Sequence, residues 1–429
     1  MLARRSSLIR GHRLLHPFNP MVSREKPDSA LRPYTLSIVS CTYNRYETLN
    51  FMGEYNTELT KLVDQLNRSA TQARSVEKRS LDQILGAALQ KNASDVILVS
   101  GSPVTMRING KLQPEGSAPL NAEELNGILL PLLTATKSKE LQEKKSVDFC
   151  FVRTSIGRFR TNIHHQRSTL AAAIRVLPEQ VPSLESLHLP PALALLTERK
   201  QGLVLLTGPT GCGKTSTLAA LVDRINARRH DHIITIEDPI EYQHANRNSL
   251  VEQIELGQDT PDFAQAVRSV LRQDPDVILV GEMRDSDTMA AALTAAETGN
   301  LVLTSLHTND AAQTVSRILD TFPSGYQSQI RQQLSLALLA IISQQLVPAV
   351  DGAGRYPAVE ILVATGATRN LIRRGDDHQL RASIETGRAD GMLTMEQSLG
   401  ELIRAGRISR ETALAHCYNT DDLRRYLVS

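Results

Sequence analysis

The stretch LVLLTGPTGCGKTSTLAALV, residues 203–222, decides the fold of the part of the chain that contains it. An apolar run of the kind that forms a buried strand leads into a loop with three glycines, and an Ala/Leu-rich run of helical character follows. The loop fits the pattern GxxxxGK[ST], in which backbone N–H groups curl around phosphate oxygens because no Cβ is in the way. The sequence therefore predicts a strand, a phosphate-binding loop and a helix in succession.

Individual residues of this loop have separate expected tasks. The helix would begin at the anion, with its free N–H groups and the positive end of its dipole facing the phosphates. Lys214 would bridge the β- and γ-phosphates, and the hydroxyl of Thr215 would ligate Mg²⁺. Cys212 is expected to matter through its backbone, the alternative being a redox-sensitive thiol whose pKa is lowered by the helix N-terminus. The expected nucleotide-binding residues are Gly208, Pro209, Thr210, Gly211, Cys212, Gly213, Lys214, Thr215 and Ser216.

Strands and helices alternate after the loop. The segments HIITIE, DVILVG and LVLTSL each resemble a buried strand and are each followed by a helical stretch. This alternation predicts a parallel sheet with helices on both faces. Further strand candidates between Asp95 and Leu177 predict a smaller domain of mixed structure upstream. The expected fold class is therefore α/β.

Pattern and composition divide the chain into five segments. These are a basic extension of little structure, a small α/β domain, a proline-rich extended linker, a nucleotide-binding core and a C-terminal set of short amphipathic helices. Because Met21 and Met52 are later possible starts, the extension is also explained by a start codon that was called too early. In chain order the segments are residues 1–79, 80–177, 178–191, 192–365 and 366–429.

Composition argues against several classes of protein. The 429 residues carry a formal net charge of +2, which is too close to zero to indicate a polyanionic partner. There is no Trp and only 4% of the residues are aromatic, so stacking surfaces for single-stranded nucleic acid are not expected. The four cysteines form no CxxC pair, which argues against a zinc site and favours a reducing compartment. No apolar run is long enough to span a membrane, and a secretory signal is not evident.

Two carboxylates are expected beside the phosphates. The apolar segment VILV, residues 277–280, is followed by Gly281 and Glu282. Because Gly281 stands where such sites usually have an aspartate, Glu282 would face the metal ion, polarise the attacking water, or do both. The segment TIEDPIEY, residues 235–242, follows a second strand, and its Glu241 would orient or deprotonate the attacking water. The alternative for this segment is a solvated acidic turn.

A histidine follows a third strand, in the segment TSLHTND at residues 304–310. Ligands of open α/β sheets bind at the carboxyl ends of the strands, where this segment is expected to lie. The imidazole of His307 could hydrogen-bond the γ-phosphate or hold a carboxylate in place. A single histidine is more often structural, so that alternative stays open.

Taken together and in this order, these segments resemble the ATPases of type II and type IV secretion machines, most closely the branch that retracts type IV pili. The resemblance covers about residues 81–421. It is carried by a Walker A loop, an Asp box in TIEDPIEY, a Walker B segment in DPDVILVGEMRD and a His box in HTNDAAQTVSRILDTFP. In that family Glu282, Glu241 and His307 occupy the positions of the functional residues of the last three motifs.

Two features are similar to the retraction branch in particular. GATRNLIRRG, residues 366–375, is similar to the AIRNLIRE stretch associated with retraction, and the tetracysteine insert typical of assembly and secretion ATPases is absent. The chain also departs from the family pattern. Asn300 stands where a second histidine is frequent, Arg374 stands where an acid is common, and the upstream segment SDVIL lacks a histidine that the family usually has there.

The resemblance implies a ring hexamer whose subunits have an N-terminal PAS-like domain and a C-terminal RecA-like domain with a helical tail. It implies ATP and Mg²⁺ as cofactors, an inner-membrane pilus or secretion platform protein as partner, and a cytoplasmic location with membrane association through partners only. Arginines of the N-terminal domain reach the nucleotide in such rings, and Arg158 and Arg160 alternate on one strand, which places them on the same face. The alternative for these arginines is a solvated edge-strand charge set.

Three other functions remain as alternatives to a pilus-retraction motor. The first is the ATPase of a type II or type IV-like secretion apparatus. The second is an ATP-binding regulatory ring component with little turnover. The third is a nucleic-acid motor, which the low aromatic content and the near-neutral charge disfavour. Which of Glu241 and Glu282 is the general base stays open at this point.

Overall fold

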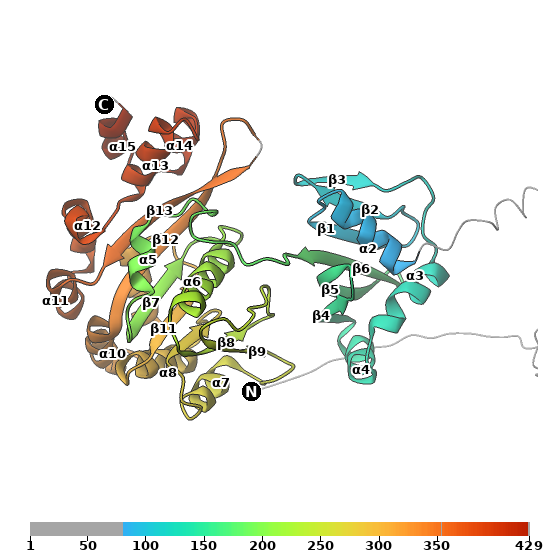
Figure 1. Cartoon of the computed structure of the whole chain (residues 1–429), viewed down its shortest axis with the longest axis horizontal. Coiled ribbons are helices and arrows are strands. Elements are labelled where there is room, and N and C mark those ends of the chain that lie inside the picture. The colour runs from blue at the N-terminus through green and yellow to red at the C-terminus, as the bar shows by residue number, and fades with distance from the viewer. Residues whose placement is uncertain (1–79, 353, 428–429) are drawn as a thin grey trace, which may run out of the picture. The chain divides into compact units, whose positions relative to one another are not determined.

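The computed structural model describes residues 80–352 and 354–427 of the chain (Figure 1). The predicted basic extension, residues 1–79, lies outside the described residues. No helix in these described ranges is both long and apolar enough to cross a membrane.

The upstream part, residues 80–177, is an antiparallel sheet with three α-helices. Its six strands lie in the order β3-β2-β1-β6-β5-β4. Strand β5 alternates between buried and more exposed side chains, and its buried members Phe159 and Ile163 pack in the core with Leu85 and Leu98. The strands are β1 (Asp95–Val99), β2 (Thr105–Ile108), β3 (Lys111–Pro114), β4 (Ser146–Arg153), β5 (Gly157–Gln166) and β6 (Thr169–Leu177). The helices are α2 (Leu81–Gln90), α3 (Ala122–Leu129), the short 3₁₀ helix η1 (Leu130–Leu132) and α4 (Ala135–Lys144).

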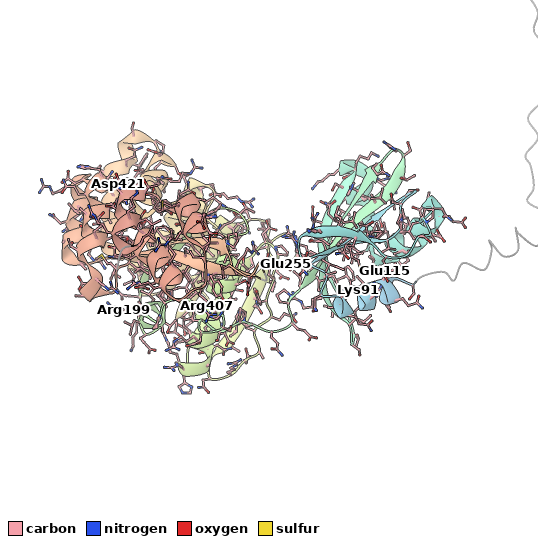
Figure 2. All side chains as sticks on the ribbon, turned by 90° about the horizontal axis from the view of Figure 1, so that it is seen from above. Lys91, Glu115, Arg199, Glu255, Arg407 and Asp421 are labelled. Carbon is pink, nitrogen blue, oxygen red and sulfur yellow. The ribbon has the colours of Figure 1, made fainter. Side chains whose placement is uncertain are left out.

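Local sequence accounts for several ends of these elements. Ser80 caps α2 in a capping box, because its hydroxyl accepts from the backbone N–H of Gln83 and the Gln83 side chain accepts from the backbone N–H of Ser80. Charged side chains on this part lie outside the core, as the paired Lys91 and Glu115 show (Figure 2). Strand β3 was not predicted, because all four of its residues are exposed and its apolar content is low.

The sheet that carries the phosphate loop has seven strands in the order β13-β12-β7-β11-β10-β8-β9. Its neighbouring strands pair in parallel except β13, which pairs antiparallel with β12. The strands are β7 (Gly202–Thr207), β8 (His232–Glu237), β9 (Leu250–Glu255), β10 (Val277–Val280), β11 (Leu301–Leu306), β12 (Leu338–Pro348) and β13 (Arg355–Val363). The expected parallel sheet is confirmed, with two strands, β9 and β12, that the sequence did not predict.

Helices cover both faces of this sheet, which explains why its central strands are apolar throughout. Leu203 and Leu205 of β7 face one core, and Val204 and Leu206 face the other. The first core also holds the buried faces of α7 (Phe263–Val270), α8 (Ser286–Glu297), α9 (Ala311–Asp320) and α10 (Ser324–Ala337). The second core holds those of α5 (Ala192–Leu196) and α6 (Lys214–Arg228).

The segment between the two sheets, residues 178–191, was expected to be an extended linker. This segment contributes Leu184 and Leu189 to the core beneath α5 and α6. Both side chains are buried, because the apolar residues of this segment have a sheet face to pack against. The boundaries of the five proposed segments themselves stay predictions.

The last three C-terminal helices form a small core of their own beside β12 and β13, whereas Ile372 and Ile384 of the two helices before them belong to the first core of the sheet. Met395 and Leu399 pack with Val347 and Ala358 of the two strands, and with Leu423. The helices are α11 (Gly366–Arg374), α12 (Leu380–Thr386), α13 (Met395–Arg404), α14 (Arg410–His416) and α15 (Thr420–Leu427), with the 3₁₀ helices η2 (Asp377–Gln379) and η3 (Arg388–Asp390) between them. Thus the tail is helical, as expected, and is attached to the strand beside the phosphate loop.

Candidate nucleotide-binding and catalytic site

A cavity of about 600 Å³ lies at the carboxyl ends of the parallel strands. The phosphate loop follows β7, which pairs with β11 and β12 in the middle of the sheet order. Because β7, β8, β10 and β11 run parallel, the segments that follow them meet at one edge. The lining includes Lys214, Thr215, Glu237, Glu241, Glu282 and His307. The structure therefore brings together the loop and the acidic and histidine segments that the sequence singled out.

The phosphate loop depends on backbone conformations that favour glycine. Gly208 has a φ of 142° and Gly213 a φ of 91°. A Cβ on Gly208 would lie 2.2 Å from the backbone oxygen of Gln344 and 2.7 Å from Sγ of Cys212. No side chain fits there, so the loop can close tightly against β12 only with glycine at this position.

Lys214 lies across the loop that it follows. Its Nζ donates to the backbone oxygens of Gly208, at 2.7 Å, and Pro209, at 3.1 Å. Burial lowers the pKa of Lys214, and the neighbouring Cys212 and Glu282 oppose that effect. The ammonium thus sits in a partly desolvated position, where a phosphate would be a stronger partner than these carbonyl groups.

Cys212 does not have the activated thiol that a helix N-terminus can produce. Burial raises the pKa of Cys212, and this outweighs the opposing effect of Lys214. The thiol is 3% exposed. A neutral buried thiol matches the expectation that this position acts through its backbone, and it argues against the redox alternative.

Gln344 of β12 clamps the phosphate loop, and the sequence did not single it out. Its Nε2 donates to the backbone oxygen of Cys212 at 2.7 Å, and its Oε1 accepts from Oγ1 of Thr217 at 2.9 Å. The side chain therefore joins the loop to the first turns of α6. Its neighbour Ser343 accepts a hydrogen bond from Thr207 at the end of β7. Three polar residues in a row inside an apolar stretch, Ser343 to Gln345, are the pattern that could have indicated this clamp.

Glu282 and His307 lie side by side at the cavity. Nε2 of His307 is 3.5 Å from Oε2 of Glu282, and Arg284 pairs with the other carboxylate oxygen. The His307 side chain is half exposed, at 50%, whereas that of Glu282 is 15% exposed. The Glu282 carboxylate thus lies between the side chains of Arg284 and His307. The half-exposed imidazole of His307 stays accessible from the cavity.

The Asp-box segment contributes a buried and an accessible carboxyl group. Oε1 of Glu237 accepts from Oγ1 of Thr235 at 2.7 Å and from Nε2 of Gln253 at 3.1 Å. Burial raises the pKa of Glu237, so this carboxyl is poorly suited to stay charged without its partners. Glu241 is less buried and lines the cavity. Tyr242 hydrogen-bonds Ser216 of α6 at 2.8 Å, which connects this segment to the helix of the phosphate loop.

The two arginines of β5 have different surroundings. Arg158 donates to the backbone oxygens of Ile240, at 2.9 Å, and Glu241, at 3.1 Å. Arg160 lines the cavity, together with Arg175 of β6, its partner in the strand register. The structure therefore places Arg160 at the cavity and Arg158 on the Asp-box backbone. Arg175 was not among the residues that the sequence singled out.

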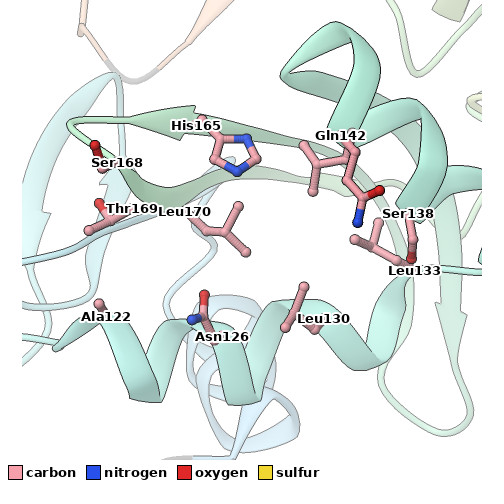
Figure 3. A pocket seen from close by; sticks show the side chains of 11 residues that line it. Ala122, Asn126, Leu130, Leu133, Ser138, Gln142, His165, Ser168, Thr169 and Leu170 are labelled. Atoms are coloured by element: carbon pink, nitrogen blue, oxygen red, sulfur yellow. The ribbon is translucent and has the colours of Figure 1, made fainter. Parts of the chain in front are cut away.

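A second cavity, of about 290 Å³, lies in the upstream part and has a different chemistry. Figure 3 shows His165 of β5 and Gln142 of α4 facing Asn126 of α3 across it. Leucines, Ala122 and uncharged polar groups make up the rest of its described lining, which includes neither Lys nor Arg. Phosphates need cationic or N–H donors, so the cavity at the sheet edge is the one suited to a nucleotide.

The residues at the sheet edge fit a magnesium ion that arrives with the nucleotide. Among the described residues, no group of three or more His, Cys, Asp and Glu side chains could hold a metal ion. Mg²⁺ is usually bound by one or two protein oxygens together with phosphates and water. The Thr215 hydroxyl and the Glu282 carboxylate supply protein oxygens of this kind at the same cavity.

The strand, glycine loop and helix, with carboxylates from neighbouring parallel strands at the same edge, define a nucleotide-binding P-loop ATPase. Residues 69–425 match the family model described as "Type II/IV secretion system protein", and the chain belongs to that family. It is thus a P-loop ATPase by its fold and by its family.

Relatives and a solved structure match most of the chain. The twitching motility protein of Neisseria gonorrhoeae is 43% identical over 335 residues, which are 78% of this chain and 89% of that protein. The type IV pilus retraction ATPase PilT of Pseudomonas aeruginosa is 40% identical over 333 residues, 78% of this chain and 96% of that one. The crystal structure of the pilus retraction motor PilT with bound ADP superposes with a TM-score of 0.76 at 41% identity, covering 81% of this chain and 99% of that one. The expected PAS-like and RecA-like architecture is confirmed by this likeness.

Proposed function

We propose that this chain is a hexameric, Mg²⁺-dependent ATPase motor that powers type IV pilus retraction by ATP hydrolysis. The observation that carries the proposal is the meeting of Lys214, Glu282 and His307 at one cavity beside the glycine loop. The relatives named for twitching motility and pilus retraction are matched over 89% and 96% of their own length, so the similarity extends over nearly the whole of both proteins.

In the proposed mechanism the loop amides and Lys214 hold the β- and γ-phosphates of ATP. Thr215 and Glu282 would hold Mg²⁺, which would neutralise charge that develops on the transferred phosphoryl group. Glu241 lines the cavity and is only partly buried, and it would orient the attacking water or accept its proton. Glu282 already pairs with Arg284 and lies beside His307, so we assign it the metal-facing role and favour Glu241 as the base.

His307 and the arginines would respond to the γ-phosphate. The imidazole lies beside Glu282 and is half exposed, so it can contact an oxygen of the γ-phosphate. Release of that phosphate would then change the contact between His307 and Glu282. Arg160 would neutralise phosphate charge from the cavity wall, and Arg158 would hold the Asp-box backbone while it does so. The N-terminal domain would close on bound ATP and reopen after hydrolysis. This movement would convert the energy of hydrolysis into movement of ring segments.

The proposed setting is the cytoplasmic face of the inner membrane. A ring of six subunits would bind an inner-membrane pilus platform protein and associate with the membrane through that partner only. A secretion platform is the alternative partner, because the matching family includes secretion ATPases. No role for nucleic acid is part of the proposal.

Replacing Lys214 tests the nucleotide chemistry and the machine together. We expect Lys214→Ala to lower the rate of phosphate release at least 100-fold while the thermal unfolding midpoint changes little, because it removes the ammonium group that would neutralise charge on the transferred phosphoryl group. Cells that carry only this variant should lose twitching and accumulate surface pili. The exposed Lys200, changed to Ala, serves as control.

Other outcomes identify the alternatives. Hydrolysis at the wild-type rate in Lys214→Ala would contradict the nucleotide site. Loss of protein export with normal twitching would show a secretion motor. A wild-type protein that binds ATP with little phosphate release, unchanged by Glu282→Ala, would show a regulatory ring component.

A further inference from the structure

The segment that carries His307 has few packing contacts of its own. Residues 307–310 connect β11 to α9, and within them only Thr308 is buried. Oγ1 of Thr308 hydrogen-bonds Oγ1 of Thr314 in α9 at 2.7 Å. With little side-chain packing, the conformation of this segment depends on the hydrogen bonds made to its backbone.

Two hydrogen bonds from the C-terminal part of the chain hold this segment and the first residue of α9, which follows it. The backbone N–H of Ala311 donates to Oε1 of Glu360 in β13 at 3.0 Å. The hydroxyl of Tyr418, between α14 and α15, donates to the backbone oxygen of Asn309. That oxygen is two residues from His307, so the tyrosine acts close to the imidazole that faces Glu282.

Tyr418 is itself held firmly. Oε1 of Glu396 accepts from the backbone N–H groups of Tyr418, at 2.9 Å, and Asn419, at 2.8 Å. Glu396 is 1% exposed and also pairs with Arg381 of α12 at 3.3 Å. The buried carboxylate of Glu396 therefore fixes the position of Tyr418 relative to α13. Through its hydrogen bond to Asn309, the Tyr418 hydroxyl in turn fixes the position of the His307 segment.

We propose that Tyr418 is a positioning residue for ATP hydrolysis, which sets His307 against Glu282 by holding the backbone oxygen of Asn309. This inference rests on the role proposed above for His307. The tyrosine does not line the nucleotide cavity, so its effect reaches the reaction only through the segment that it holds. It also makes the C-terminal helices part of the hydrolytic machinery, since a shift of α13 would move the hydroxyl.

The variant Tyr418→Phe in the full-length protein tests this directly. It keeps the aromatic ring and removes the hydroxyl, which donates to the backbone oxygen of Asn309 and also hydrogen-bonds the side chain of Gln345 in β12. We expect kcat to fall about threefold to tenfold, the range that one net hydrogen bond accounts for, because the imidazole would be less well placed. The KM for ATP and the affinity for ADP should stay within about twofold of wild type, because the phosphate loop is untouched.

Tyr426→Phe is the matched control. The hydroxyl of Tyr426 accepts from Nε2 of Gln397 at 3.3 Å, within the same group of helices. A merely structural role for these hydroxyl groups would make the two variants behave alike. An equal fall in kcat for both, or wild-type kcat in Tyr418→Phe, would overturn the inference.

A double-mutant cycle shows whether the effect passes through His307. In a His307→Ala background, Tyr418→Phe should cause no further loss of kcat, because the group that it positions is gone. Equal losses in the two backgrounds would overturn the positioning role. If His307→Ala alone leaves kcat unchanged, the proposed role of His307 is wrong, and a loss in Tyr418→Phe must then have another route. Impaired His307→Ala with unaffected Tyr418→Phe would instead overturn the inference alone.

Discussion

Glu360 shows how one buried residue makes stability depend on pH. It is 4% exposed, and its main partner is the backbone N–H of Ala311. Burial raises the pKa of Glu360 to about 7. The Ala311 N–H and Arg381 have smaller effects that lower this pKa, and Asp310 and Glu396 have smaller effects that raise it. The protonated form is therefore the one that the folded protein favours below neutral pH.

The sign of the pH effect follows from the raised pKa. In the unfolded chain the carboxyl titrates near 4.5, and in the folded protein its pKa is about 7. The stability that the protonated group contributes is thus fully present below about pH 4.5 and is lost as the pH rises through 7. We predict that Glu360→Gln gains about 3 kcal/mol in unfolding free energy relative to wild type across this interval, since one pKa unit is worth about 1.4 kcal/mol.

Urea unfolding at several pH values between 4.5 and 8 measures this difference. The same replacement at the more exposed Glu401, Glu401→Gln, is the control, because Glu401 pairs with Arg388 at the surface. A difference between Glu360→Gln and wild type that is constant over the interval would contradict the prediction.

At the scale of elements, the guanidinium group of Arg369 in α11 reaches the end of α10, and that of Arg331 in α10 reaches Ile372 of α11. Arg369 donates to the backbone oxygens of Ser335, at 2.7 Å, and Leu336, at 2.5 Å, and its Nε donates to Ala364 at 3.1 Å. The first two acceptors are among the last carbonyl groups of α10, which have no partner within the helix. The stretch RNLIRR thus contains a residue that completes the C-terminus of a neighbouring helix.

We predict that Arg369→Ala lowers the free energy of unfolding by about 1–3 kcal/mol, because it leaves these carbonyl groups, two of them partly buried, without their donor. Arg369→Lys should recover only part of the loss, since an ammonium lacks the planar fork. Arg373→Ala, at an exposed position of the same helix, should stay within about 0.5 kcal/mol of wild type. Chemical unfolding of the three variants measures this, and equal losses in Arg369→Ala and Arg373→Ala would contradict it.

Strand β12 is an element that the sequence did not predict, and its surroundings explain why. Strand β12 follows α10 without a break, because the helix ends at Ala337 and the strand begins at Leu338. No glycine or proline marks this change, so the apolar run was not recognised as a strand. The strand is stabilised by pairing with β7 and β13, which are distant in sequence.

At the scale of the whole molecule, the proposed hexamer predicts a particle of six chains, each of 47.2 kDa. We expect analytical ultracentrifugation with ATP and Mg²⁺ to show this mass, and specific ATPase activity to rise with protein concentration as rings assemble. Removal of Mg²⁺ with a chelator should abolish hydrolysis. A protein that stays monomeric at every concentration while it hydrolyses ATP at full rate would contradict the hexamer.

The sequence by itself determined the local structure that makes this chain a P-loop ATPase. Gly208, Gly213 and Lys214 lie within one strand-loop-helix unit, and the requirements of phosphate binding act over these few residues. Regular alternation then sufficed to predict a parallel sheet whose edge gathers Glu241, Glu282 and His307.

Only the tertiary structure decided which distant groups complete the site. Gln344 reaches the phosphate loop, Glu360 the N-terminus of α9, and Tyr418 the backbone beside His307. Each of these contacts depends on the order of strands in the sheet and on where the C-terminal helices pack. A buried amide, carboxyl or hydroxyl selects its partner in three dimensions, because what it needs is any correctly placed donor or acceptor, and the spacing of residues along the chain does not record that placement.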